Sequence, residues 1–281
     1  LSLDMMYKTA GIQINYDYIS EEDFEKKFKI GNYLAPLTIA LFANSPFNEN
    51  KLSGFLSYRG KVWQETNRGG IMPNTFESVN FEKYIDHAIN YPILFLKKNG
   101  KYYSPNGQTF RDFLNGNLSF LKGEKPTLED FENHLGTIFT EIRLKQVIEF
   151  RSLDTCNFGC ICNGPSFFTG LIYGSLDETY EIIKNWKKEE VMDAYLNAPK
   201  QGLNTLLKNK KLIDWAKIFL DISKKGLDKR NELNKSGKNE TIYLKHIEEI
   251  ISNKKTRAEM LIEQYNKTKK LEFLINHDEN F

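Results

Sequence analysis

The chain has 281 residues, of which 40% are hydrophobic and 13% are aromatic. This length and content suffice for one large hydrophobic core or for two smaller ones. Lysine and arginine number 39 against 37 for aspartate and glutamate, so the formal net charge is only +2. Because so small an excess gives no strong field for a polyanion, the composition does not suggest a nucleic-acid partner.

The apolar segments are too short to predict a membrane helix. The best candidate, residues 34–43, is about half of the roughly 20 residues that a bilayer needs, and it predicts a buried helix. No signal peptide is visible at the start of the sequence. We therefore expect a cytoplasmic protein without a membrane partner.

Three cysteines, Cys156, Cys160 and Cys162, lie within seven residues. An odd and clustered set is unlike the disulfide framework of a small secreted protein. A zinc site usually has four ligands with paired C-x-x-C spacing, which this cluster lacks. We therefore expect these cysteines to be buried or unoxidised thiols.

The first part of the chain predicts strands and helices in mixed order. Residues 5–18 alternate between apolar and polar side chains, which predicts a long strand with Thr9, Gln13 and Asn15 on its polar face. Ser20 precedes three acidic residues, a pattern that predicts a helix from this point to about residue 43.

Residues 44–70 have little periodicity, which predicts loops or short helices. Asn99-Gly100 predicts a hairpin between residues 93–98 and 101–103. We also expect helices at 81–90, 109–114 and 128–135 and a second long strand at 143–152.

Helical periodicity dominates the sequence after Pro165. The expected helices are residues 166–173, 176–186, 188–196, 211–233, 242–253 and 256–269. The fold class is therefore α+β, with an antiparallel sheet and helices first and a helical C-terminal layer after it. We expect residues 1–164 to form the sheet-bearing part of a domain, with residues 165–281 packed on it as a helical region.

Glu149 and Arg151 are the first candidates for chemistry. Being two apart in an expected strand, they point to the same face about 7 Å apart, while Phe150 points into apolar packing. Such a pair is either a structural ion pair or exposed sheet face, or a carboxylate that holds a metal beside a cation that holds phosphate or carboxylate. The spacing alone leaves both interpretations open.

The loop region contributes Arg59, Trp63 and Arg68. Arginine suits the bidentate binding of carboxylate or phosphate, although a single surface arginine carries no such meaning. Two arginines in a glycine-rich segment with aromatic residues raise the hypothesis of an anion site.

Several blocks of sequence follow one another in a recognisable order. They are MMYKT through QIN at 5–15, ALFANSPF at 40–47, SGFLSYR at 53–59 with Trp63, TFR at 109–111 to ENHL at 132–135, EIRLK through EFR at 141–151, and Pro165 with FFTGL at 167–171. With these blocks the chain resembles the plant and proteobacterial type of glutamate–cysteine ligase over nearly its whole length. The match is to the C-terminal two-thirds of that family.

The resemblance implies a fold like that of glutamine synthetase, in which a curved, mostly antiparallel sheet is lined by the active site. It implies that ATP phosphorylates the γ-carboxylate of glutamate and that the amine of cysteine attacks the γ-glutamyl phosphate, a step of glutathione biosynthesis. Magnesium and arginines would stabilise the negative groups that meet there. The implied partners are ATP, Mg²⁺, glutamate and cysteine.

The resemblance also implies roles for particular residues. Glu149 and Gln13 are implied as metal ligands, and Arg151 and Arg59 as catalytic cations that face the transferring phosphoryl group or glutamate. The implied substrate-binding residues are Arg59, Arg68, Thr9, Asn15 and Trp63.

The chain departs from the family pattern in two places. The family's Glu-x-Glu strand, which supplies further magnesium ligands, has no counterpart here, and the sequence begins at Leu1. We therefore expect a truncation and a further N-terminal segment of the same protein as partner of an otherwise incomplete site. At one regulatory cysteine pair of the plant members this chain has Pro105 and Phe120, so we expect no thiol switch of the plant kind.

Two alternatives to a glutamate–cysteine ligase stay open from the sequence. One is a related carboxylate–amine ligase that uses another amine, since no pattern identifies the residues that read the thiol side chain. The other is a non-catalytic remnant of such a ligase that binds a ligand or partner.

Overall fold

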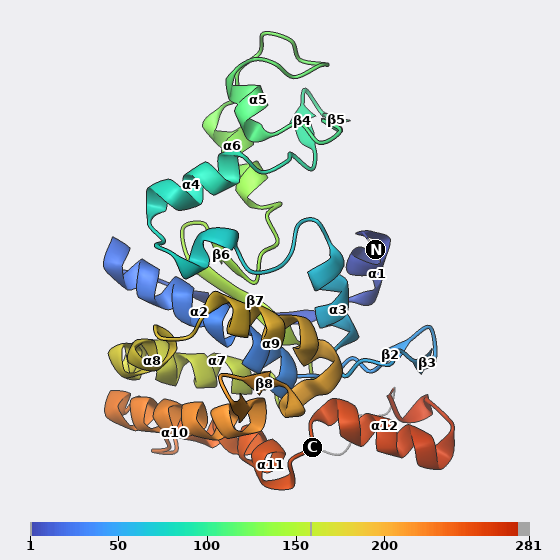
Figure 1. Ribbon diagram of the computed structural model, residues 1–281, viewed down its shortest axis with the longest axis vertical. Helices are drawn as coiled ribbons and strands as arrows, with labels where there is room; N and C mark the ends of the chain where they lie inside the picture. The colour runs from blue at the N-terminus through green and yellow to red at the C-terminus, as the bar shows by residue number, and fades with distance from the viewer. Residues whose placement is uncertain (1, 158, 275–281) are drawn as a thin grey trace.

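The computed structural model describes residues 2–157 and 159–274. Figure 1 shows a small central sheet crossed by one long helix, a smaller unit at the top, and layers of helices below. Helices and antiparallel strands are mixed along the chain, which confirms the expected α+β class.

The central sheet has three strands in the order β1-β7-β6, all antiparallel. Its strands are β1 (Gly11–Tyr16), β7 (Ile148–Asp154) and β6 (Ile142–Leu144). Asn15 of β1 and Arg143 of β6 both lie opposite Glu149 of β7. Strand β1 and the strand of Glu149 therefore share one sheet.

The single long strand expected at 143–152 is wrong, because this segment is a hairpin. Strands β6 and β7 are joined at residues 145–147, where the Lys145 N–H donates to the Val147 carbonyl at 3.0 Å. Lys145 and Gln146 are both exposed, so two polar residues interrupt the apolar alternation without a glycine or proline to announce the turn.

The long strand expected at 5–18 is correct only in its second half. Residues Ser2–Lys8 form the short helix α1, in which Lys8 pairs with Asp4 one turn earlier at 2.8 Å. Met6 and Tyr7 are 70% and 81% exposed, so the apparent alternation at the start did not reflect a buried strand face. Thr9 consequently lies in the connection between α1 and β1.

Helix α2 (Glu21–Leu41) covers the apolar face of the sheet and confirms the expected long helix. Ser20 caps it by accepting from the Asp23 N–H at 3.1 Å. Thr38 meets Ser152 of β7 through a hydrogen bond of 2.7 Å between their hydroxyl groups. At Gly31 a Cβ atom would lie 2.4 Å from Ile142 Cδ1, so only glycine allows the helix this close to the sheet.

The segment after α2 contains only short elements before the smaller unit at the top of Figure 1. They are β2 (Phe47–Asn48), β3 (Lys51–Leu52), α3 (Tyr58–Glu65) and the 3₁₀ turn η1 (Pro73–Phe76). This confirms the expectation of loops and short helices.

We call residues 91–137 the apical unit, because they have a hydrophobic cluster of their own. Helix α4 (Phe81–Ile89) leads into it, and its elements are β4 (Leu96–Lys98), β5 (Lys101–Tyr103), α5 (Phe110–Leu114) and α6 (Leu128–Leu135). The expected hairpin and all three expected helices are confirmed. The buried cluster comprises Ile93, Leu96, Phe110, Phe113 and Leu118.

The helical C-terminal region lies beneath the sheet in Figure 1. Its helices are α7 (Asn163–Thr169), α8 (Leu176–Ile183), α9 (Lys188–Gln201), α10 (Leu212–Arg230), α11 (Lys245–Asn253) and α12 (Arg257–Thr268). The shorter elements are η2 (Gly170–Gly174), η3 (Gly202–Asn204), β8 (Leu206–Leu207), β9 (Lys210–Lys211), η4 (Glu240–Leu244) and η5 (Glu272–Leu274). The expected helices are confirmed, while the division of the chain at 164/165 stays a prediction.

In the part of the chain that the structure describes, no helix has both the length and the apolar character needed to cross a membrane.

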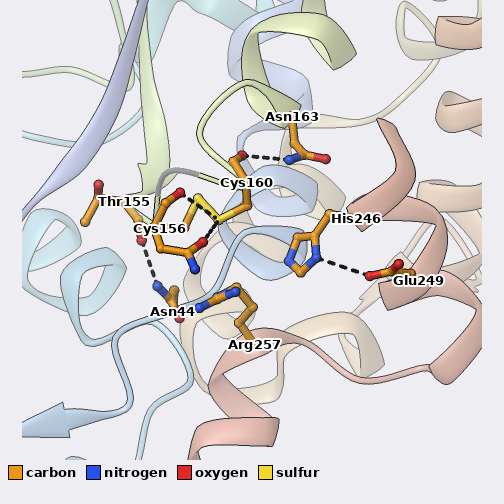
Figure 2. The surroundings of a disulfide bond; sticks show 9 residues. Asn44, Thr155, Cys156, Cys160, Asn163, His246, Glu249 and Arg257 are labelled. Atoms are coloured by element: carbon orange, nitrogen blue, oxygen red, sulfur yellow. Dashed lines mark hydrogen bonds and ion pairs between the residues drawn. A yellow bond between two sulfur atoms is a disulfide. The ribbon is translucent and has the colours of Figure 1, made fainter. Parts of the chain in front are cut away.

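The cysteines correct one expectation. Cys156 and Cys160 form a disulfide in the loop between β7 and α7 (Figure 2), where the sequence led us to expect buried or unoxidised thiols. Cys162 is free and exposed. A separation of four residues in a curved loop brings the two Cα atoms to 6.1 Å, within the range that a disulfide spans. Side chains fasten the loop: Asn44 donates to the Thr155 carbonyl at 2.9 Å, and Asn163 donates to the Cys160 carbonyl at 2.8 Å.

Candidate functional site

The face of the sheet turned away from α2 is polar. We call Gln13, Asn15, Arg143, Glu149 and Arg151 the polar face. Three of these side chains are buried charges, with exposed fractions of 8% for Arg143, 8% for Glu149 and 5% for Arg151. Burying a charge is costly in free energy unless the charge has a partner, so each of these side chains is expected to pair with another.

Glu149 lies between two arginines. Its Oε2 accepts from Arg143 Nε at 2.6 Å, and its Oε1 lies 3.2 Å from Arg151 Nη1. Strand spacing explains both contacts, since Arg143 is directly opposite Glu149 and Arg151 is two residues further along β7. The expected same-face pairing of Glu149 and Arg151 is confirmed, and Arg143 is an addition.

A second carboxylate continues the alternation of charge. The Arg151 N–H donates to the Glu141 carbonyl at 2.9 Å, which places Glu141, the residue just before β6, across from Arg151. Glu141 is 4% exposed, and its Oε1 accepts from the Tyr195 hydroxyl of α9 at 2.5 Å. Burial raises the pKa of the Glu141 carboxyl, while the charge of Arg59 and the hydrogen bond from Tyr195 act against that rise.

Two aromatic rings lie close to the arginines. The Arg59 and Arg151 guanidinium carbons lie 5.7 Å and 5.5 Å from the centre of the Trp63 ring. Phe139 lies 5.6 Å from Arg151 and 5.9 Å from the Arg143 guanidinium carbon. Such stacking stabilises guanidinium groups where water is excluded.

Arg59 is positioned by the start of α3 and is 4% exposed. Its Nη2 donates to the Arg151 carbonyl at 2.5 Å, which fixes the side chain against β7. A Cβ atom at Gly11 would lie 2.6 Å from Arg59 Nε, so the guanidinium needs the missing side chain of β1 in order to reach this position.

Asp154, at the end of β7, is a third buried carboxylate near these arginines. It accepts from the Asn44 N–H at 2.9 Å, the Ser45 hydroxyl at 2.7 Å and the Ser57 hydroxyl at 2.8 Å. Burial raises its pKa, and the charge of Arg59 opposes the rise. Because Ser57 caps α3, Asp154 connects β7 to the helix that carries Arg59 and Trp63.

The arginines also act on one another. Burial lowers the pKa of Arg151, and the neighbouring charge of Arg143 lowers it further, although Glu149 opposes both. Three arginines, Arg59, Arg143 and Arg151, thus alternate with Glu141, Glu149 and Asp154. The charges balance in number, which is how so many can be buried together.

The remaining expected site residues lie around this group. Gln13 and Asn15 are exposed on β1, and Gln13 falls where the register with β7 shifts. Thr9 is half-buried and donates its hydroxyl to the Met5 carbonyl at 2.6 Å. The indole Nε1 of Trp63 is buried and has no hydrogen-bond partner among the described residues. An unpaired buried donor of this kind suits a ligand acceptor or a water.

The hydrogen bonds of Arg68 are made to the apical unit and not to the polar face. It donates to the Thr137 carbonyl at 2.9 Å, to the Thr137 hydroxyl at 3.0 Å and to the Pro92 carbonyl at 2.9 Å. The guanidinium carbon also lies 5.1 Å from the Tyr91 ring. In this structure Arg68 therefore joins the loop after α3 to the apical unit.

The fit of a magnesium ion depends on the oxygen atoms of the polar face. Among the described residues, no three His, Cys, Asp or Glu side chains gather as they would around a metal. Glu149 and the amides of Gln13 and Asn15 nevertheless offer the oxygen donors that Mg²⁺ prefers, and Mg²⁺ often takes one or two carboxylates with phosphates and waters. The longer contact of Glu149, the 3.2 Å to Arg151, leaves Oε1 the freer oxygen for this role.

Sequence reasoning missed Arg143, Glu141 and Tyr195. The turn at 145–147, which brings Arg143 and Glu141 across from β7, has no glycine or proline, so no local signal pointed to these two residues. No local signal pointed to Tyr195, which is 54 residues from its partner and lies in the helical C-terminal region.

Buried arginines alternating with carboxylates on an antiparallel sheet are typical of a protein that handles anionic ligands. Comparison with known families narrows this class. The chain belongs to glutamate-cysteine ligase family 2, whose family model matches residues 1–277.

Individual relatives agree with the family. The chain is 40% identical over 270 residues to the chloroplastic glutamate–cysteine ligase of Solanum lycopersicum, an alignment covering 94% of this chain and 50% of the relative. It is also 40% identical over 271 residues to the enzyme of the same name from Arabidopsis thaliana, covering 95% of this chain and 51% of the relative. The chain thus spans about half the length of the curated relatives it matches.

Proposed function

We propose that this protein takes part in the ATP-dependent joining of the glutamate γ-carboxylate to the amine of cysteine through a γ-glutamyl phosphate. The single observation that carries the proposal is the buried alternation of Arg143, Glu149 and Arg151 on the polar face of the sheet. Membership of glutamate-cysteine ligase family 2 supports it, as do the names of the relatives. We further propose that the sheet belongs to a curved, glutamine synthetase-like fold.

In this proposal the arginines stabilise charge on the transferring phosphoryl group. Arg151 faces that group or the glutamate carboxylates, and Arg59 supports it through the shared Trp63 ring and the Arg151 carbonyl. Fixed guanidinium groups in a site shielded from water stabilise such charge better than mobile solvent does. Trp63, Asn15 and Thr9 are proposed to bind substrate, whereas Arg68, which the sequence led us to expect among them, is proposed to hold the apical unit through Thr137 and Pro92.

Magnesium is part of the proposal, with Glu149 and Gln13 as the residues of this chain that would hold it. A bound Mg²⁺ would neutralise phosphate oxygens and orient the γ-phosphate. Glu149 would then exchange part of its contact with Arg151 for the ion, which would leave the Arg151 guanidinium available to substrate.

The test is a phosphate-release assay on the intact gene product with ATP, Mg²⁺ and glutamate, and with cysteine or another amine as acceptor. We expect release that depends on glutamate and is greatest with cysteine. If another amine gives equal or greater phosphate release, that amine and not cysteine is the acceptor. No release with any amine would leave only a non-catalytic ligand-binding protein.

The location of the protein is a separate matter from its chemistry. The relatives bear the word chloroplastic in their names. For this protein the cytoplasmic location expected from its sequence stays a prediction, which fractionation of the source cells would test.

A further inference from the structure

Tyr195 of α9 joins the helical C-terminal region to Glu141, a buried carboxylate of the candidate site. Its side chain is 2% exposed, and its hydroxyl donates to Glu141 Oε1 at 2.5 Å. Tyr195 therefore links the helical region directly to Glu141, the carboxylate that the charges of Arg59 and Arg151 act on.

The backbone of α9 explains why Tyr195 is held so firmly. Pro199 lies four residues later and has no N–H, so the Tyr195 carbonyl lacks its usual partner within the helix. The side chain of Gln64, in α3, donates to this carbonyl instead. The carbonyl that Pro199 leaves free thus connects α9 to the helix that carries Arg59 and Trp63.

A second link lies one turn further along α9. The Pro199 carbonyl accepts from the Leu56 N–H at 2.8 Å and from the Ser57 N–H at 3.0 Å, at the residue that caps α3. Helices α9 and α3 are therefore joined at three backbone or side-chain contacts around Tyr195. The position of the Tyr195 hydroxyl is fixed relative to Arg59 by this joint.

Glu141 is the group through which Tyr195 acts on the arginines. The charged groups that face its carboxylate are Arg59, Arg151 and Asp154, together with the Tyr195 hydroxyl. Burial favours the neutral acid, whereas the two arginines and the hydrogen bond favour the anion. When Glu141 is neutral, Arg59 and Arg151 lose its negative charge, and their mutual repulsion is no longer offset by it.

We propose that Tyr195 and Glu141 are positioning residues for the ligase reaction, with the α9 hydroxyl keeping Glu141 anionic so that Arg59 and Arg151 stay aimed at the transferring phosphoryl group. This inference rests on the proposed function and assigns to the helical region a part in the site. Neither residue touches substrate in this account, and both act through the two arginines.

The test begins with Tyr195→Phe, which removes only the hydroxyl. Without its hydrogen bond the Glu141 carboxyl titrates at a higher pH, so the acid limb of the kcat profile should move upward by about one pH unit. We expect kcat at pH 7 to fall about tenfold while KM for glutamate and ATP changes less than about twofold, because substrate contacts stay in place.

Tyr16→Phe is the matched control. Tyr16 is 5% exposed and donates its hydroxyl to the Pro165 carbonyl at 2.8 Å, in the core on the other side of the sheet. Its loss should lower the melting temperature without moving the pH profile. If Tyr195→Phe changes only the melting temperature in the same way, its role is merely structural and the proposal fails.

A double-mutant cycle with Glu141→Gln shows whether Tyr195 acts through Glu141. Glu141→Gln should lower kcat and abolish the pH shift, and adding Tyr195→Phe should then cause little further loss. Fully additive losses would overturn the proposal, because they would mean that the two residues act independently.

An activity-independent readout separates this inference from the proposed function. Infrared titration should show a protonated-carboxyl band that Glu141→Gln removes and that persists to higher pH in Tyr195→Phe. An unchanged midpoint in Tyr195→Phe would refute the positioning role even in an active enzyme. If the intact protein shows no ligase turnover, the proposed function fails, while the infrared midpoint still decides whether Tyr195 controls Glu141.

Discussion

The apical unit and the central sheet both bury carboxylates, but for different reasons. In the apical unit Asp130 accepts from the N–H and the hydroxyl of Thr127, each at 2.8 Å, and pairs with Lys98 at 2.5 Å. Thr127 and Asp130 form the capping box of α6, so the start of a helix accounts for the buried charge.

No helix start accounts for Glu141 or Glu149. Both belong to the hairpin of β6 and β7, a place where apolar residues would fold at lower cost. A charge that a helix cap requires says nothing of function, whereas charges that a strand does not require are candidates for a site. The experiments that follow probe this contrast, beginning with the largest expected effect.

Glu149→Gln should cause the greatest loss of activity. The amide keeps the shape of the carboxylate but loses its charge, and with it the proposed bond to Mg²⁺ and the pairing with Arg143 and Arg151. We expect kcat/KM for the intact protein to fall by at least about 10³-fold in steady-state assays. Glu132→Gln on the exposed side of α6 is the matched control and should be unchanged.

The same substitution removes the negative charge that the buried Arg143 and Arg151 share, which can cost about 3–5 kcal/mol of stability. Glu149→Asp is therefore a useful second variant, because it keeps the charge and draws the carboxylate back by one methylene. Turnover close to normal in a folded Glu149→Gln protein would refute the metal-ligand role and favour a structural ion pair.

Arg151→Lys should have the next largest effect. Lysine retains the charge but not the planar group that packs near both Trp63 and Phe139. We expect kcat to fall about 10²-fold, measured at saturating ATP and glutamate. Arg111→Lys, in an exposed ion pair with Asp86 at 2.6 Å, makes the same change outside the site and should have no effect. A full rate with lysine at 151 would mean that only its charge matters.

Glu149 and Arg151 show how much of the candidate site the sequence alone predicts. Alternation within residues 148–152 correctly predicts that Glu149 and Arg151 share a face, because strand geometry fixes this whatever the rest of the fold. Ser20 with its acidic followers and Asn99-Gly100 likewise predict α2 and a hairpin from local chemistry. The polar face could thus be anticipated in part.

Other features depend on distant contacts, and no local pattern encodes them. The turn at 145–147 has no glycine, and it is stabilised by the pairing of Arg143 with Glu149 across the hairpin. The contact between Glu141 and Tyr195 needs α9 to pack beside α3. The disulfide of Cys156 and Cys160 likewise depends on how the loop after β7 curves.

Asp130→Asn should affect stability alone. It weakens the capping box of α6 and removes the ion pair with Lys98, so we expect the free energy of unfolding to fall by about 1–3 kcal/mol in urea titrations. Activity per folded molecule should not change. A loss of kcat in this variant would break the contrast between the apical unit and the sheet.

The pH dependence of this effect has a definite sign. Burial alone would raise the pKa of Asp130, but the hydrogen bonds from Lys98 and Thr127 outweigh it and lower the pKa. A carboxyl with a lowered pKa stabilises the fold above its unfolded value of about 4 and loses that contribution as the pH falls through the folded value. The stability difference between Asp130→Asn and the parent protein should therefore shrink below about pH 4.

Arg68→Gln should have the smallest effect and decides to which region Arg68 belongs. Its donors are used by Thr137 and Pro92 of the apical unit, and the residue is half-buried. Losing these contacts should lower the free energy of unfolding by about 1 kcal/mol and leave KM for glutamate and ATP unchanged. A rise in either KM with unchanged stability would instead place Arg68 beside the substrate. The arginines that bind anions would then extend from the polar face to the base of the apical unit.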